Sequence, residues 1–73
     1  MTKYIKPNFI ERSLELRCEN NEICIYGTRE GLKKLADLIN DLIDKPKQGH
    51  IHLEDYEILT KDSLIGAIAI FDR

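Results

Sequence analysis

The chain has 73 residues, of which 42% are hydrophobic and 33% are charged, and its formal net charge is −2 at pH 7. A chain of this length forms one domain, and it lacks the basic excess that neutralises phosphates, which excludes nucleic acid as an expected partner. No apolar run approaches the roughly 20 residues that span a bilayer, and the N-terminus has no apolar signal core. We therefore expect a cytoplasmic protein without membrane contact.

Residues 1–12 show the weakest pattern in the chain. Pro7 interrupts an apolar segment that includes Ile5 and Phe9, and proline disfavours the interior of a strand. We expect this segment to form an edge strand or a mobile arm of one domain that spans residues 1–73.

A β-hairpin is predicted by the alternating segments SLELRCE and EICIYG on either side of two asparagines. Asparagine tolerates positive φ, so Asn20-Asn21 suits a two-residue type I′ loop. A loop at these residues pairs Cys18 with Ile23 and Leu16 with Ile25. Apolar positions then face each other along both strands, and a slip of one residue would lose this match.

The same register separates the two cysteines. Cys18 falls on the apolar face and is expected to be a core thiol, whereas Cys24 falls on the opposite, less protected face. Side chains on opposite faces cannot form an intramolecular disulfide without rebuilding the hairpin. Only Arg17 is placed to favour a Cys24 thiolate, so a catalytic cysteine is not expected.

An amphipathic helix is predicted between Thr28 and Pro46. Thr28 is a good N-cap, and proline disfavours a helical residue before it. Gly31 costs a helix about 1 kcal/mol relative to alanine, which suggests that it permits close packing. Apolar residues recur at helical spacing and are expected to form one buried stripe, made of Leu32, Leu35, Ala36, Ile39, Leu42 and Ile43.

Two further strands complete the order β-β-α-β-β. One strand runs through HIHLE, and the last, LIGAIAIFD at residues 64–72, is apolar on both faces, which is typical of a strand buried on both sides. The expected fold is α+β, with one four-stranded, mainly antiparallel sheet and the single helix packed on one face. The other face is open to the N-terminal arm, to a second copy of the chain or to a foreign partner.

The stretch GHIHLEDYE has a chemical pattern. Alternation places His50, His52 and Glu54 on one face and turns Ile51 and Leu53 toward the core. Two imidazoles and a carboxylate are ligand types for zinc or ferrous iron, so a metal-binding protein is one alternative. A structural zinc site needs a fourth ligand, and the sequence has no third histidine. We therefore expect a polar face toward solvent or a partner, without metal or other cofactor.

Catalysis by acid and base would require a pocket, a nucleophile and a charge-stabilising group. A domain of this size with one helix offers few walls for such a pocket. The sequence therefore favours a protein without enzymatic activity.

The stretch GHIHLEDYEILTKDSLIGAIAIFD resembles a family of small bacterial immunity proteins from polymorphic toxin systems. The resemblance rests on the HIHLE strand, the LTKDS turn and the apolar last strand, with support from IYGTREGLKKLADLI, and extends from Glu22 to Phe71. It implies a non-enzymatic protein that binds a cognate toxin in the producing cell and blocks it. Gly66, Ala67 and Ala69 stand where the resemblance implies larger or charged outward residues.

Tight inhibition requires a cluster of buried contact residues with a polar rim. The residues that we expect to bind the partner are Tyr26, His50, His52, Glu54 and Tyr56. A structural homodimer, formed through the uncovered sheet face or an edge strand, is the other alternative.

Overall fold

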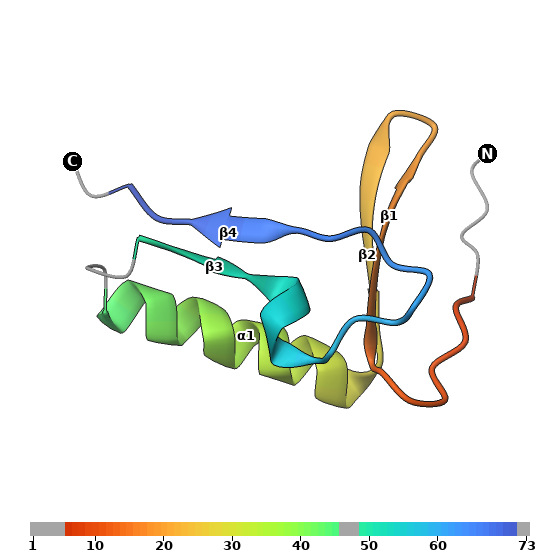
Figure 1. Ribbon diagram of the computed structural model, residues 1–73, viewed down its shortest axis with the longest axis horizontal. Helices are drawn as coiled ribbons and strands as arrows, with labels where there is room; N and C mark the ends of the chain where they lie inside the picture. The colour runs from red at the N-terminus through yellow and green to blue at the C-terminus, as the bar shows by residue number, and fades with distance from the viewer. Residues whose placement is uncertain (1–5, 46–48, 72–73) are drawn as a thin grey trace.

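The computed structural model describes residues 6–45 and 49–71. The elements follow in the order β1, β2, α1, β3, a 3-10 helix and β4. Figure 1 shows the β1–β2 hairpin standing across one end of α1, while β3 and β4 extend along it. The bounds, in the same order, are Leu14–Glu19, Glu22–Gly27, Arg29–Asp44, His50–His52, Leu53–Tyr56 and Ala67–Ala69.

The hairpin has the predicted register. β1 and β2 pair antiparallel, with Cys18 opposite Ile23 and Leu16 opposite Ile25. The φ angles of the turn residues 20 and 21 are 51° and 64°, the left-handed region that a type I′ loop requires. Asparagine reaches this region more readily than most residues, because its short side chain bonds to the local backbone. The prediction of a two-residue turn is thus confirmed.

α1 begins at the predicted cap. Thr28 Oγ1 accepts a hydrogen bond from the Gly31 N–H at 3.0 Å, which satisfies one of the free amides of the first turn. A Cβ added to Gly31 would overlap the backbone carbonyl of Ser13, so the glycine does permit close packing of α1 against the start of β1. The Ser13 carbonyl also accepts a hydrogen bond from Thr28 N–H at 3.0 Å.

The prediction of one fully buried helical stripe is wrong. Leu35 and Leu42 are buried, but Leu32, Ile39 and Ile43 are exposed. The apolar arc of α1 is wider than the two-stranded layer β3–β4 that packs along it, so the outer part of the arc stays uncovered.

The prediction of one four-stranded sheet is also wrong, because the strands form two separate two-stranded antiparallel sheets, β1–β2 and β3–β4. Residues 58–64 lie along the outer edge of β1 without forming a strand. Leu14 donates to the Ile58 carbonyl at 2.9 Å and accepts from Thr60 N–H at 2.8 Å. This irregular segment occupies the edge of β1 to which β4 would have to pair in a four-stranded sheet. Among the described residues, its one strand-like contact is a parallel bridge between Leu14 and Leu59.

The predicted last strand is much shorter than expected. Within the described part of residues 64–72, only Ala67–Ala69 forms β4, which pairs with the equally short β3. The prediction that this strand is buried on both faces is wrong, since Leu64, Ile65 and Phe71 are exposed. The β3–β4 ribbon has α1 on one side only, so one row of its side chains turns to the core and the other faces outward.

The core lies between α1, the base of β1 and the β3–β4 ribbon. The cysteines exchange their predicted environments, with Cys18 exposed and Cys24 buried. β1 and β2 extend beyond the core toward the turn, so the apolar row of β1 loses its cover before Cys18. Cys24 is shielded from the other side by hairpin neighbours such as Glu22. The core residues are Leu14, Leu16, Leu35, Leu42, Ile51, Leu53 and Ile58.

Residues 6–12 lead into β1 without forming a helix or strand, and residues 1–5 of the predicted edge strand or arm lie outside the described residues. Arg12 Nη2 lies 3.8 Å from Glu57 Oε1. Within the described residues, no helix has the length and apolar character needed to cross a membrane.

Candidate functional site

β3 displays its two histidines outward. Ile51 between them is buried in the core, whereas His50 and His52 are exposed, which confirms the predicted alternation. The two imidazole rings meet edge to face, with centroids 5.0 Å apart. Alternation along an extended strand places both rings on one side.

Glu54 joins the histidines although it belongs to the 3-10 helix that follows β3. Glu54 Oε2 lies 3.5 Å from His52 Nδ1, and Oε1 accepts a hydrogen bond from the Gly66 N–H at 3.4 Å. An exposed pair at this distance contributes little to stability. Its effect is to hold a carboxylate beside the imidazoles and to tie the 3-10 helix to the start of β4.

Two alanines of β4 complete this surface. His50 pairs with Ala69 and His52 pairs with Ala67, and both alanines are exposed. We call the surface formed by His50, His52, Glu54, Ala67 and Ala69 the histidine face. Because alanine side chains are short, a partner can approach the backbone of β4 closely.

Large apolar residues lie next to both ends of β4. Ile65, just before the strand, is 74% exposed, and Phe71, just after it, is 86% exposed. Exposed apolar side chains beside a polar rim are typical of interaction surfaces.

The two tyrosines of the predicted site lie elsewhere. The Tyr26 hydroxyl donates to Glu19 Oε1 at 2.6 Å within the β1–β2 sheet. Tyr56 lines a groove of about 180 Å³ together with Ile58 and residues of α1 such as Leu38. Of the five predicted residues, the structure therefore brings together the two histidines and Glu54.

A metal site is not formed by this trio. Across residues 6–45 and 49–71, no group of three or more His, Cys, Asp or Glu side chains is arranged to hold a metal ion. His52 lies next to both His50 and Glu54, although Glu54 belongs to the 3-10 helix and not to the predicted strand.

The polar network centred on Glu15 was not predicted. The Glu15 side chain is only 2% exposed, accepts from the Thr60 hydroxyl at 2.5 Å and pairs with Arg17 at 2.7 Å. Arg17 Nε also lies 3.5 Å from Glu19 Oε2. The Thr60 hydrogen bond, followed by Arg17, lowers the pKa of Glu15 although burial opposes this. Alternation predicted an outward Glu15, and no sequence signal places residues 58–64 over it.

The buried Cys24 is a poor nucleophile. Desolvation raises the pKa of its thiol, and the neighbouring Glu22 carboxylate acts in the same direction. The thiolate is the reactive form of cysteine, so this environment disfavours it.

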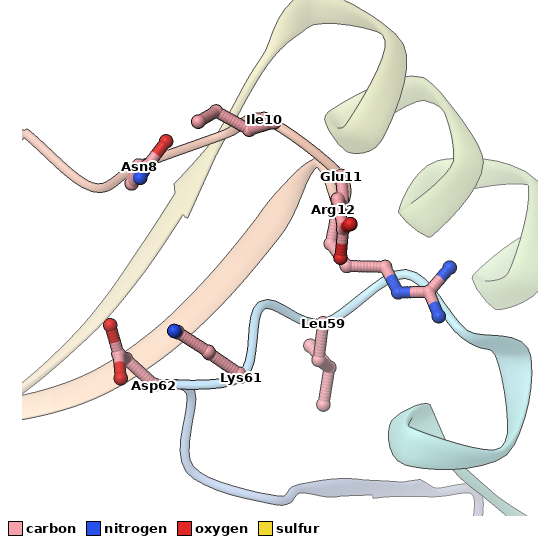
Figure 2. A pocket seen from close by; sticks show the side chains of 7 residues that line it. All are labelled: Asn8, Ile10, Glu11, Arg12, Leu59, Lys61 and Asp62. Atoms are coloured by element: carbon pink, nitrogen blue, oxygen red, sulfur yellow. The ribbon is translucent and has the colours of Figure 1, made fainter.

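An open depression of about 510 Å³ lies where residues 8–12 face residues 59–62. Figure 2 shows the Arg12 side chain directed away from Lys61 and Asp62, so the charged groups do not converge on one point. The lining residues are Asn8, Ile10, Glu11, Arg12, Leu59, Lys61 and Asp62, and they include neither histidine nor cysteine.

These features define a small α+β domain with an exposed polar and apolar surface. The chain belongs to the Immunity protein 32 family, whose family model matches residues 22–65, more than half of its length. The match confirms the resemblance found in the sequence. Immunity proteins of this kind are typically non-enzymatic and neutralise a toxin. No curated protein and no solved structure gives a significant match.

Proposed function

We propose that this protein binds a cognate toxin in the cytoplasm of the producing cell and blocks it by occupying a surface that the toxin needs. The observation that carries the proposal is the family match over residues 22–65. The protein acts stoichiometrically, as a bound inhibitor without catalytic residues.

The toxin binds the histidine face in this proposal. Ala67 and Ala69 permit close approach, Ile65 and Phe71 supply apolar contacts, and the histidines with Glu54 form the polar part of the interface. The apolar side chains along β4 lie beside the polar row of β3, and a few apolar contacts next to polar groups supply most of the binding energy in many interfaces. Tyr56 extends the interface around the 3-10 helix, and Tyr26 contacts the toxin from the hairpin.

Co-expression tests the function. The reading frame next to the gene for this chain is expressed with and without it, and growth and copurification are measured. We expect the chain to restore growth and to copurify with the neighbouring product. Toxicity that persists, together with the absence of a complex, would overturn the proposal.

Two substitutions of alanine by arginine test whether the toxin binds the histidine face. Ala67→Arg introduces a long charged side chain on the histidine face, whereas Ala36→Arg makes the same change at an exposed position on α1. We expect Ala67→Arg to abolish copurification and protection, and Ala36→Arg to retain both, with similar melting temperatures. If both variants protect equally, the histidine face is not the toxin site even though the function stands.

A further inference from the structure

The two edges of the β1–β2 sheet differ in their cover. On the β1 side, the N–H of Leu14 and the carbonyls of Leu14 and Leu16 bond to residues 58–64. The Leu16 N–H donates to the Ser63 hydroxyl at 2.8 Å. The backbone groups of these two leucines therefore point away from β2, and this edge is occupied.

The other edge is the outer side of β2. Since Leu14 and Leu16 direct their backbone groups away from β2, the pairs Leu14–Gly27 and Leu16–Ile25 are the non-hydrogen-bonded pairs of the ladder. By alternation, the backbone N–H and C=O groups of Ile23 and Ile25 point away from β1. Within residues 6–45 and 49–71, no backbone group bonds to them.

The side chains of this edge are also unprotected. Ile23 is 73% exposed and Ile25 is 52% exposed. Proteins usually protect an open edge with lysine, proline, a bulge or a very short strand. β2 has six residues, EICIYG, and none of these devices, and its single charged residue is Glu22.

We propose that two copies of the chain pair along β2, antiparallel about a two-fold axis at Cys24, so that the hairpins form one four-stranded sheet. Ile23 of each copy then lies opposite Ile25 of the other copy, and their outward backbone groups form the new ladder. Exposed isoleucines of both copies pack side by side on one face of the joined sheet.

A second copy is favoured over an unrelated strand because β2 is complementary to itself. Pairing about Cys24 sets isoleucine opposite isoleucine and Glu22 opposite Tyr26, so no like charges meet. Gly27, which packs against Leu32 of α1, stays outside the ladder. The histidine face belongs to the other sheet, so Tyr26 is the one proposed toxin contact that shares β2 with the dimer edge.

Oxidative cross-linking tests the register. Cys24 forms a non-hydrogen-bonded pair with its copy, in which Cα atoms lie about 4.5 Å apart, within the range of a disulfide. In Cys18→Ser protein, Cys24 is the one cysteine that remains, and this protein is oxidised with copper phenanthroline. Cys24→Ser protein is the matched control. We expect a covalent dimer on a non-reducing gel only when Cys24 is present. A non-covalent dimer that is cross-linked in Cys24→Ser protein, through the exposed Cys18, but not in Cys18→Ser protein would overturn the register.

Sedimentation tests whether the dimer forms through the outer edge of β2. Ile25→Lys places a charge on β2, and Ile65→Lys makes the same change at an exposed isoleucine outside the hairpin. We expect the original chain and Ile65→Lys to sediment as dimers at high micromolar concentration and Ile25→Lys to sediment as a folded monomer. A monomeric original chain, or a dimer that persists in Ile25→Lys, would overturn the proposal.

Discussion

Glu15 connects the hairpin to the C-terminal half of the chain through a buried carboxylate. Its bonds to Thr60 and Arg17 favour the ionised form, which lowers the pKa of Glu15 below its ordinary value of 4.5. A carboxyl group with a lowered pKa stabilises the fold above its unfolded pKa, and this contribution disappears as the pH falls through the folded pKa.

Glu15→Gln is therefore expected to destabilise the protein at pH 7 by about 1–3 kcal/mol, because a buried hydrogen bond to a charged group is weakened. At pH 3 the difference from the original chain should narrow, since pH 3 lies below the ordinary pKa of 4.5 and the unfolded chain then binds a proton that the folded state, with its lowered pKa, disfavours. Urea unfolding at the two pH values measures this.

Glu11→Gln is the matched control, because Glu11 is exposed. It should leave the free energy of unfolding nearly unchanged at both pH values. A Glu15→Gln deficit of the same size at pH 7 and pH 3 would show that the loss does not come from the carboxylate charge.

Among the elements, the first turn of α1 lies very close to the start of β1. The Gly31 position has no room for a Cβ beside the Ser13 carbonyl, and Ser13 in turn accepts from Thr28 N–H. This contact sets how closely the first turn of the helix approaches the hairpin.

Gly31→Ala should destabilise the protein by about 1–3 kcal/mol through overpacking. Helix propensity alone would predict a gain of about 1 kcal/mol, so the sign of the change separates the two effects. The midpoint of urea unfolding is the measurement. Asn40→Ala, at an exposed position of α1, is the control and should stabilise by about 0.5 kcal/mol. A higher urea midpoint in both variants would contradict the close contact at Gly31.

Sequence patterns predicted the elements whose signals are local. The asparagine turn, the Thr28 cap and the row of His50 and His52 each depend on neighbours within a few residues. The separate sheets and the burial of Glu15 depend on the position of residues 58–64 along β1. Sequence periodicity does not predict such a long-range contact. Cys18 is exposed because the hairpin extends beyond the core, so the alternation was predicted correctly but the extent of the core was not.

At the scale of the whole molecule, many large apolar side chains remain on the surface of a small domain. Domains of this size have limited cores and gain stability from partners. The exposed residues are Ile10, Ile23, Ile25, Leu32, Ile39, Ile43, Tyr56, Leu64, Ile65 and Phe71. They lie on β2, on α1, on the 3-10 helix and in segments next to the strands, so a partner on one element leaves other apolar surface uncovered.

Binding of the cognate toxin should raise the melting temperature of this chain. A partner present at a free concentration of 100 times its Kd adds about 2.7 kcal/mol, which corresponds to a shift of more than about 10 °C for a domain of this size. Thermal unfolding with an inactive form of the neighbouring gene product measures the shift. The Ala67→Arg variant is the control and should melt at the same temperature with and without that product.

The position of residues 58–64 along β1 also has a consequence for the order of folding. Glu15 and Thr60 are 45 positions apart in the chain, and Leu16 and Ser63 are 47 apart. The hairpin and α1 need only local contacts, which form early, whereas closing so long a loop is slow. During synthesis on the ribosome, the hairpin therefore exists with Glu15 bonded to Arg17 but without its Thr60 hydrogen bond until the last third of the chain has emerged.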